Sequence, residues 1–332
     1  MTHETITTKP GGVSRRTLIK SAGALGTALA AGTVGAPAVR GQGKKTLRFL
    51  NTETSIDSIR ALKVACAEYE KQFGTQVVVD SVPLDDAFTK VTTSLRGGQP
   101  YDIATFAFIG HVLLLQAGGH LMPLTELTNK HEWGPKILFP VKNEVYWYPY
   151  DYNLAWIYYR KDLYEKHGLS VPKSYAEMLK NAQTLTAEGR YGSLFPIGSN
   201  GATNWLAPGF MWAEGVKLFD DKWNVTLDNA DMTPRVTRYL DFFAELYKTM
   251  PSGASQASFG EVLSNFSSDK VAHAAYAGRM IEALERNAPK LATQYGMTPY
   301  MDSTGTAKAV NHGYDGWVVL KTPNSDESMK FM

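Results

Sequence analysis

Strand-like and helix-like segments alternate between residues 46 and 116, and this alternation restricts the fold more than any other feature of the sequence. The segment 58–73 repeats apolar residues at three- and four-residue spacing, as a helix packed on a sheet does. Alternation at this length predicts a mainly parallel sheet covered by helices on both faces, which is an α/β fold. The predicted elements are strands 46–51, 76–82 and 101–107 and helices 58–73, 85–95 and 109–116.

The rest of the chain continues the mixed pattern. Residues 174–177 form a capping box that predicts a helix start, and Thr233-Pro234 predicts an N-cap followed by proline at the first helical position. A chain that ends just after nucleating a helix looks cut, so we expect an incomplete protein. The predicted helices are 161–167, 174–186, 204–214, 233–248, 259–266, 280–288 and 325–332, and the predicted strands are 191–197, 271–276 and 316–320.

The first 38 residues carry the features of an export signal. Ser14-Arg15-Arg16-Thr17-Leu18-Ile19-Lys20 precedes a run of small residues, and Ala36-Pro37-Ala38 supplies a cleavage site. Paired arginines before a Gly/Ala-rich run predict a twin-arginine signal peptide over residues 1–38. The run is too short to span hydrocarbon, and Thr33 stands where a lipid anchor needs cysteine. We therefore expect a soluble periplasmic protein that meets the twin-arginine (Tat) translocon during export.

Charge and cysteine content exclude several classes of protein. The chain has 34 basic and 32 acidic residues without a basic cluster in its mature part, so we expect no nucleic-acid partner. Cys66 is the only cysteine, which excludes an intrachain disulfide and a cysteine zinc site. We expect it to be a buried apolar residue on a helix.

Sequence motifs for catalysis are missing. The chain has no phosphate-binding loop, no dinucleotide fingerprint, no H-E-x-x-H and no G-x-S-x-G. The adjacent pairs Asp85-Asp86 and Asp220-Asp221 point to different faces, so neither pair converges as a general acid and base must. We interpret both as solvated charges. We predict no catalytic residue, no metal ligand and no cofactor, although carboxylates brought together from distant segments stay open.

Residues 144–162 are dense in tyrosine and tryptophan, interrupted by Asp151, Asn153, Arg160 and Lys161. Two β-prone runs, 145–150 and 154–159, are joined by residues 151–153. Rings with polar tips suit a surface that is dry against protein and wet against a ligand. An aromatic-rich core strand is the alternative interpretation of this stretch.

Several segments together resemble the family 1 extracellular solute-binding proteins of ATP-driven sugar importers, the group that includes maltose-binding protein. The resemblance covers residues 44–332. Val216 departs from it, because the family has a second glycine there. The segments that carry it are 101–103 with 116–124 (QAGGHLMPL), 148–163 (YPY to YRKDL), 172–179 (PKSYAEML), 212–220, 268–272 (SDKVA) and 313–320.

This resemblance implies two doubly wound α/β domains that face each other across a ligand cleft, the type II periplasmic binding protein fold. It places chain crossings within residues 150–156 and 311–316. Domain one would comprise residues 44–152 and 313–332 and domain two residues 153–310, with the C-terminal part of the family fold missing. Ligand would bind where strand and helix ends converge, and closure about the hinge would follow.

The resemblance also implies a set of ligand-binding residues. A sugar has apolar ring faces and a fringe of hydroxyls, so its site needs aromatic plates and Asp, Asn, Glu or Arg at the edges. Phe106, Trp212 and Trp317 suit a core role equally well. The implied set is Glu53, Phe106, Phe108, Tyr150, Asp151, Asn153, Trp205, Trp212, Tyr276, Arg279, Tyr314, Asp315 and Trp317.

Three hypotheses of function follow. The first is a monomeric receptor that binds a mono- or oligosaccharide and delivers it to an inner-membrane ABC permease. The second is an exported carbohydrate-active enzyme. The third keeps the fold and changes the ligand to a polyamine or organic anion, because Arg279 stands where the family often has an aromatic residue. An unpaired Arg279 in the cleft would indicate a negatively charged ligand.

Overall fold

The computed structural model of the protein describes residues 45–134, 137–186 and 189–332. The predicted export signal, residues 1–38, lies outside these ranges. No helix within the described ranges is long and apolar enough to cross a membrane.

One sheet carries the alternating segments of the first third of the chain. Its order is β2-β1-β3-β13-β6, with β1, β2 and β3 parallel and β13 antiparallel to both of its neighbours. The predicted strand 46–51 is confirmed residue for residue as β1. The strands are β1 (Thr46–Asn51), β2 (Gln76–Ser81), β3 (Ile103–Phe106), β6 (Tyr148–Pro149) and β13 (Gly316–Val319).

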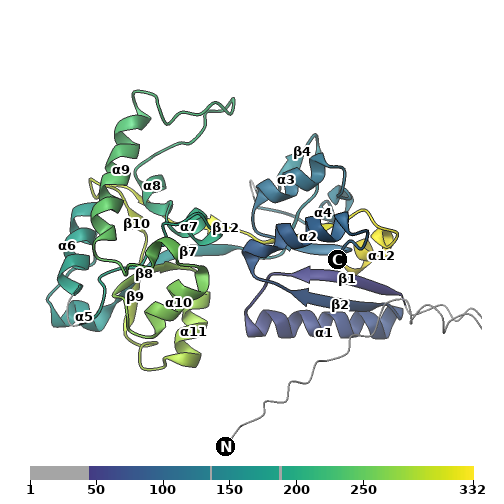
Figure 1. Ribbon diagram of the computed structural model, residues 1–332, viewed down its shortest axis with the longest axis horizontal. Helices are drawn as coiled ribbons and strands as arrows, with labels where there is room; N and C mark the ends of the chain where they lie inside the picture. Colours follow the sequence, from purple (N-terminus) through teal and green to yellow (C-terminus); the bar gives the residue numbers. More distant parts are fainter. Residues whose placement is uncertain (1–44, 135–136, 187–188) are drawn as a thin grey trace, which may run out of the picture. The chain divides into compact units, whose positions relative to one another are not determined.

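Helices cover both faces of this sheet, as the α/β pattern predicts (Figure 1). α1 (Ile56–Phe73) packs on one face, and α2 (Ala87–Arg96) and α3 (Ile109–Ala117) pack on the other. Successive strand residues point to opposite faces. Phe49 accordingly belongs to the core beneath α1, whereas Leu50 belongs to the core beneath α2 and α3.

A second sheet is built around β7 (Asn153–Arg160), the second aromatic run of the sequence. β12 (Asn311–Gly313), β8 (His273–Tyr276) and β9 (Tyr295–Thr298) all pair with it antiparallel. The helices of this region are α5 (Lys161–Lys166), α6 (Tyr175–Leu185), α7 (Gly201–Leu206), α8 (Gly209–Ala213), α9 (Met232–Tyr247), α10 (Phe259–Ser267) and α11 (Arg279–Asn287).

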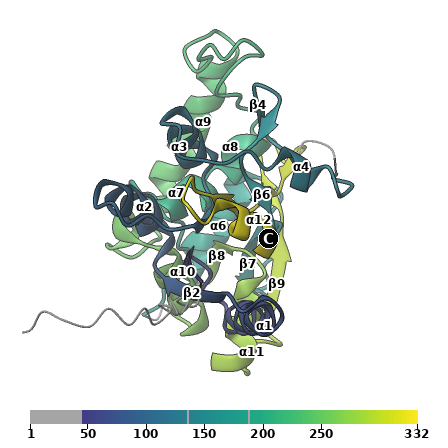
Figure 2. The ribbon, with the colours of Figure 1, turned by 90° about the vertical axis from the view of Figure 1, so that its right-hand side faces the viewer.

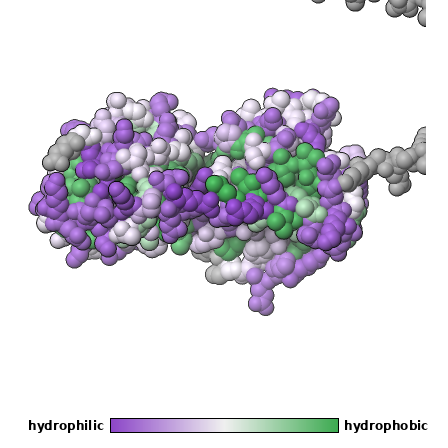
Figure 3. Space-filling model, turned by 90° about the horizontal axis from the view of Figure 1, so that it is seen from below, coloured by the Kyte–Doolittle hydropathy of each residue, from purple (hydrophilic) through white to green (hydrophobic). Residues whose placement is uncertain are grey.

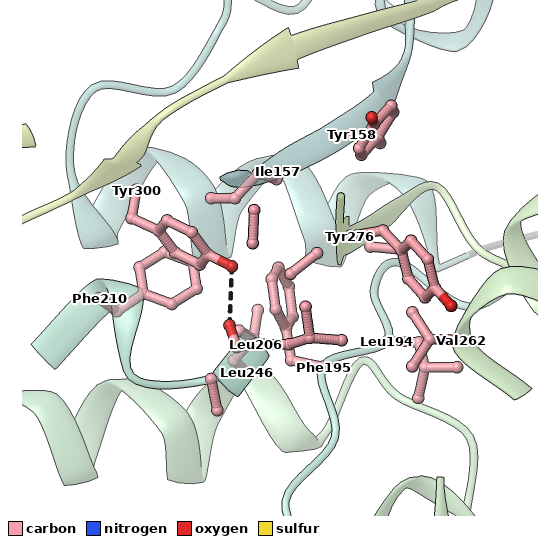
Figure 4. Packing of buried hydrophobic residues seen from close by; sticks show 14 of the residues in the cluster. Ile157, Tyr158, Leu194, Phe195, Leu206, Phe210, Leu246, Val262, Tyr276 and Tyr300 are labelled. Atoms are coloured by element: carbon pink, nitrogen blue, oxygen red, sulfur yellow. Dashed lines mark hydrogen bonds between the residues drawn. The ribbon is translucent and has the colours of Figure 1, made fainter. Parts of the chain in front are cut away.

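The core of this region is dense in aromatic rings (Figure 4). The Tyr300 hydroxyl is fully buried and donates to the Leu206 carbonyl at 2.8 Å, which satisfies its polar end. Gly209 has no room for a side chain, because a Cβ there would lie 2.4 Å from the Tyr300 ring. Aromatic residues of this part of the sequence therefore serve largely as core.

Short elements complete the described chain. They are η1 (Leu84–Asp86), α4 (Thr125–Thr128), β4 (Pro140–Val141), β5 (Glu144–Val145), η2 (Ala254–Gln256), β10 (Tyr300–Met301), β11 (Lys308–Ala309) and α12 (Ser325–Phe331).

The chain passes from the first sheet to the second between β6 and β7, and it returns between β12 and β13. These passages fall at residues 150–152 and 314–315, inside the predicted crossings. The Tyr150 N–H donates to the Asp315 carbonyl at 3.0 Å, so the two passages lie side by side. The domain boundaries themselves stay a prediction.

Four element predictions were wrong in detail. Residues 191–197 form only two isolated bridges, because Gly192 packs its backbone tightly against the Ala182 carbonyl and Pro196 lacks a donor. The predicted helix 204–214 is two helices, separated at Ala207 and Pro208. α9 begins at Met232 rather than after Thr233, and the Asn229 side chain accepts its N–H at 2.8 Å. The aromatic run 145–150 is divided between β5 and β6.

Glu327 joins α12 to α1 and to the residues that precede β1 and β2. Its carboxylate accepts from the Tyr69 hydroxyl at 2.6 Å and the Thr75 hydroxyl at 2.9 Å, and it pairs with Lys45 at 3.1 Å. These hydrogen bonds, led by that of Tyr69, lower the pKa of Glu327 to about 2.

Glu327→Gln is expected to reduce the free energy of unfolding by roughly 1–3 kcal/mol at pH 7, the range for hydrogen bonds to a charged group. The loss should fade as pH falls from about 4.5 towards 2, because the wild-type carboxylate then becomes protonated. Urea unfolding measures it. Exposed Glu126→Gln is the matched control, and an equal loss in both variants would contradict this role.

Candidate functional site

Polar side chains gather where the chain passes between the sheets. Asp151 is the centre of this group: its Oδ1 accepts the Asp315 N–H at 2.6 Å, and its Oδ2 accepts from Asn153 Nδ2 at 2.7 Å. Tyr150 precedes it, and the Tyr150 ring stacks on Trp317 with centroids 5.0 Å apart. The Asp151 side chain therefore holds the two connecting segments, 150–152 and 314–315, together.

Glu53 reaches this group from the end of β1. Its Oε1 accepts the N–H groups of Thr54 and Ser55 at 2.7 and 2.6 Å, which orients the carboxyl group. The carboxyl ends of parallel strands are where ligands bind in α/β sheets, because helix N-termini and loops converge there. Glu53 therefore lies at the edge of the sheet where α/β proteins bind their ligands, and its ligand-binding role stays a prediction.

Three half-buried carboxyl groups lie near one another. Burial raises the pKa of Asp315 to about 8, and the charges of Asp151 and Glu53 raise it further. Burial also raises the pKa of Asp151, although the Asp315 N–H and Asn153 oppose the shift. Asp315 accordingly holds a proton at neutral pH, so its carboxyl group can donate a hydrogen bond.

The Tyr150 hydroxyl is buried and has no hydrogen-bond partner among the described residues. Burial, followed by the charges of Asp315, Asp151 and Glu53, raises its pKa, so the hydroxyl keeps its proton. An unpaired buried hydroxyl costs about 1–3 kcal/mol. A ligand oxygen in this position would recover that cost.

Two aromatic side chains from the region around β7 lie near the hinge segments or the Glu53 carboxyl group. Trp205 on α7 and Tyr276 at the end of β8 both contact Phe259, with centroids 6.1 and 6.3 Å apart. The Trp205 Nε1 is buried without a partner in the part of the chain that the structure describes. A Cβ on Gly313 would lie 3.0 Å from it, so the glycine lets β12 approach the indole ring.

Arg279, the first residue of α11, is occupied. Its guanidinium donates to the Thr54 hydroxyl and, at 3.2 Å, to the Thr54 carbonyl. Burial raises the pKa of Tyr276 to about 12, with the Arg279 charge lowering it and the Glu53 charge raising it. Tyr276 therefore lies near both Arg279 and the Glu53 carboxyl group. Arg279 is paired with Thr54.

α11 makes two further contacts with the start of α1, which lies beside it in Figure 2. The Ser55 hydroxyl donates to Glu282 at 3.2 Å, and Arg286 pairs with Asp57 at 2.8 Å. The contacting residues of α11 are spaced by three and four positions, so they share one helix face.

A second set of contacts joins Phe108, which follows β3, to the start of α7. The Gly201 N–H donates to Asp85 Oδ1 at 3.1 Å, and a Cβ on Gly201 would lie 2.8 Å from the Phe108 ring. Asp85 is exposed in the first turn of η1, as its interpretation as a solvated charge predicts, and its carboxylate also accepts the Gly201 N–H. This second contact was not predicted. Asp85 lies in the segment after β2, as Glu53 lies in the segment after β1, and this similar position could have indicated it.

The other predicted site residues lie as follows. Phe106 is buried in the core beneath α2 and α3. Tyr314 stacks on Trp147 with centroids 4.8 Å apart, and Trp317 meets Phe49 on the α1 face. Trp212, on α8, is 39% exposed. The ligand-binding role of each stays a prediction.

Two surface cavities have linings that do not include Glu53, Asp151 or Asp315. One of about 370 Å³ is lined by α1, Trp317 and the end of α12, and the other, of about 240 Å³, lies between α5 and Val171. The face that carries α1 shows hydrophobic surface among hydrophilic residues (Figure 3), and Ile56 and Val64 are exposed there. No cluster of His, Cys, Asp and Glu suited to a metal ion occurs in residues 45–134, 137–186 and 189–332.

Solved structures share this fold. A solute-binding protein of Thermotoga lettingae bound with alpha-D-tagatose has a TM-score of 0.73 and 23% identity, over 86% of this chain and 75% of that chain. An Agrobacterium vitis protein with D-mannitol has a TM-score of 0.66 and 22% identity, over 86% and 71%. Maltose-bound MalE3 of T. maritima has a TM-score of 0.72 and 17% identity, over 86% and 75%. The fold is that of the type II periplasmic binding proteins.

The family follows from the sequence match. Residues 54–332 match the family model described as bacterial extracellular solute-binding protein, and the chain belongs to this family. The mannitol-binding protein of Pseudomonas aeruginosa is 27% identical over 228 residues, 63% of this chain and 50% of that protein. The putative periplasmic-binding protein YcjN of Escherichia coli is 33% identical over 102 residues, 29% and 23%. The chain spans half or less of these relatives' length.

Proposed function

We propose that this protein is the substrate-binding component of an ABC transporter. It captures a sugar or polyol at the passage between its two sheets, closes by a hinge motion about residues 150–152 and 314–315, and delivers the ligand to a membrane permease. Its family supports the binding role, and relatives and neighbours with sugars or polyols in their names support the ligand class.

One observation carries the proposal: segments that are distant in the sequence bring three carboxyl groups near one another and near the buried, unpaired Tyr150 hydroxyl. Glu53, Asp151 and Asp315 supply acceptors and one acidic proton, and Tyr150 and Trp205 supply buried donors without partners among the described residues. Hydroxyl groups both donate and accept, so a polyhydroxylated ligand satisfies this mixed set.

The pairing of Arg279 bears on the charge of the ligand. An arginine that binds an anionic ligand would have unpaired guanidinium N–H groups in the absence of that ligand. The Arg279 guanidinium instead donates to the hydroxyl and the carbonyl of Thr54. The adjacent Glu53 and Asp151 repel anions. The site therefore favours a neutral hydroxylated ligand over an organic anion.

The enzyme hypothesis receives less support. Glycosidases place two carboxyl groups on opposite sides of the scissile bond. Here Asp151 accepts a hydrogen bond from the backbone of Asp315, and its charge acts on the Asp315 carboxyl group, so these two carboxyl groups lie close together. We propose a binding protein without turnover.

We further propose that the protein works as a monomer outside the inner membrane, after export of the folded chain through the twin-arginine route. The paired arginines at positions 15 and 16 and the extracellular character of the family support this. A fusion of residues 1–38 to a folded reporter should be exported, and replacement of both arginines by lysine should stop export.

Calorimetric titration with a panel of sugars, polyols, a polyamine and a dicarboxylate tests the ligand class. We expect micromolar or tighter binding of at least one sugar or polyol with no product formed. Product release would favour the enzyme, and binding only of the polyamine or dicarboxylate would overturn the carbohydrate assignment.

Trp205→Ala is expected to weaken the binding of that ligand by roughly 1–3 kcal/mol, which is the scale for losing a buried aromatic contact. The same calorimetric titration measures the change. Trp223→Ala is the matched control, since Trp223 is 72% exposed on the loop before α9. An unchanged affinity in Trp205→Ala would remove this residue from the site.

A further inference from the structure

Two sets of contacts join helices of the region around β7 to the segments that follow the parallel strands of the first sheet. In the first set, Arg279 at the start of α11 donates to the hydroxyl and the carbonyl of Thr54, which lies between β1 and α1. In the second set, the Gly201 N–H at the start of α7 donates to Asp85 Oδ1, in the segment between β2 and α2. Both sets lie outside the hinge segments, so they add to the covalent connection between the regions around β1 and β7.

The contacts at α11 are polar and lie at the surface. Arg286 pairs with Asp57 in the first turn of α1 at 2.8 Å, and the Ser55 hydroxyl donates to Glu282 at 3.2 Å. The Arg286 and Asp57 side chains are 39% and 59% exposed, and a single ion pair at such exposure contributes little. The contacts of this helix face therefore act as a set, and each of them is weak enough to open again.

The contact at Gly201 depends on the lack of a side chain there. Gly201 is buried, and a Cβ at this position would lie 2.6 Å from Asp85 Oδ1 and 2.8 Å from the Phe108 ring. Real Cβ atoms almost never come this close to another atom, so Asp85 and Phe108 would have to move away. The φ angle of Gly201 is outside the left-handed range, so the backbone of α7 itself would accept alanine. The glycine therefore serves the contact between the two regions.

The side chains on the other side of this contact suit a contact that opens and closes. Asp85 is exposed, so water solvates its carboxylate when the contact is broken. When the contact forms, Asp85 accepts one of the N–H groups that the first turn of a helix leaves without an intrahelical partner. The Phe108 ring meets His111 of its own region edge-on, with centroids 5.6 Å apart. Opening exchanges a hydrogen bond within the protein for hydrogen bonds to water, which costs little net free energy.

We propose that the two sets of contacts form a latch, which holds the regions around β1 and β7 together and slows their separation about the hinge. This inference rests on the proposed sugar-binding function and adds what controls the hinge motion. Gly201, Asp85 and Arg286 are positioning residues: they act on the arrangement of the two regions through the contacts described above.

Distance measurements between two spin labels on the full chain, with no sugar added, test the latch. The labels are attached at Lys90→Cys on α2 and Ser264→Cys on α10, both exposed positions. Cys66 stays unlabelled, because it is buried and burial raises the pKa of its thiol to about 11. Gly201→Ala should increase the population with the longer distance at least fivefold, because the added carbon separates the contact. Gly110→Ala on α3, where a Cβ meets nothing within 4 Å, is the matched control and should keep the wild-type distribution.

Arg286→Glu tests the contacts at α11 independently. It places a negative charge opposite Asp57 and should increase the population with the longer distance at least threefold, whereas Arg286→Lys keeps the positive charge and should stay close to the wild type. Thermal melts confirm that each variant is folded. An unchanged distribution in one variant would overturn the part of that set of contacts, and unchanged distributions in both would overturn the latch.

The latch and the receptor function fail separately. Because the distances are measured without sugar, a latch that fails this test leaves the receptor function standing. A calorimetric titration in which no sugar or polyol binds would overturn the receptor function, and the distance distributions would still decide whether the latch exists.

Discussion

Asp315→Asn is expected to make the protein more stable than the wild type at pH 8, by roughly 3–5 kcal/mol, and equally stable near pH 4. The pKa of Asp315 is raised from 3.8 to about 8, first by burial and then by the charges of Asp151 and Glu53. Between these pH values the folded state holds a proton that the unfolded chain has released. The free energy of unfolding therefore falls as pH rises, and asparagine removes this dependence.

Urea unfolding of both proteins from pH 4 to pH 9 measures the effect. The difference between them should grow steadily over this range and level off above pH 8. Asp221→Asn, at an exposed position, is the matched control and should run parallel to the wild type. Parallel curves for Asp315→Asn would show that Asp315 is ionised throughout and is not buried with its neighbours.

Acidification is expected to destabilise the region around β7, because it protonates His273 on β8. This side chain is fully buried, and burial lowers its pKa from 6.5 to about 4. Its Nδ1 lies 2.6 Å from the Gly192 carbonyl and must donate to it, so Nε2 is the acceptor for the Tyr164 hydroxyl at 2.6 Å. Asn181 then donates to the Tyr164 oxygen at 3.2 Å. Every polar atom of the neutral imidazole is satisfied.

Because the pKa of His273 is lower in the folded protein, the unfolded chain takes up this proton at a higher pH than the folded protein does. The stability contributed by neutral His273 is complete above pH 6.5 and is lost as pH falls towards 4, by roughly 3 kcal/mol in total. The Asp315 effect runs in the opposite direction and is present in both proteins, so it cancels when they are compared. The difference in free energy of unfolding between wild type and His273→Gln should therefore fall as pH falls from 6.5 towards 4.5. The difference between wild type and exposed His167→Gln should stay constant over this range. Below about pH 4.5 the Glu327 carboxylate adds its own loss, so the His273 term is measured above that value.

Much of the fold was predictable from local pattern. Strand 46–51 was predicted residue for residue, and the helix predicted over 58–73 is α1, which begins two residues earlier. Hydrophobic spacing and capping residues act over one or two turns, so the sequence displays them directly. Predictions failed where tertiary contacts override the local signal, as at residues 191–197, where packing of Gly192 prevents a continuous strand.

The candidate site was predictable only in part. Tyr150, Asp151 and Asn153 are neighbours in the chain. They stand in a stretch dense in tyrosine and tryptophan, which indicates a binding surface. The contact of Asp85 with Gly201 was not predicted, because nothing next to Asp85 in the sequence indicates it. Whether Arg279 is paired also depends on a residue more than two hundred positions away, Thr54.

The sequence by itself determined the alternation of strands and helices, the order of the aromatic and carboxyl residues, and the family to which the chain belongs. Only the tertiary structure decided which of these residues share one environment. Glu53 and Asp315 lie at opposite ends of the described chain, and they meet because β13 joins the sheet beside β3 while β1 lies on the other side of β3. Strand order is a property of long-range pairing, and neither hydrophobic period nor residue type along the chain specifies it.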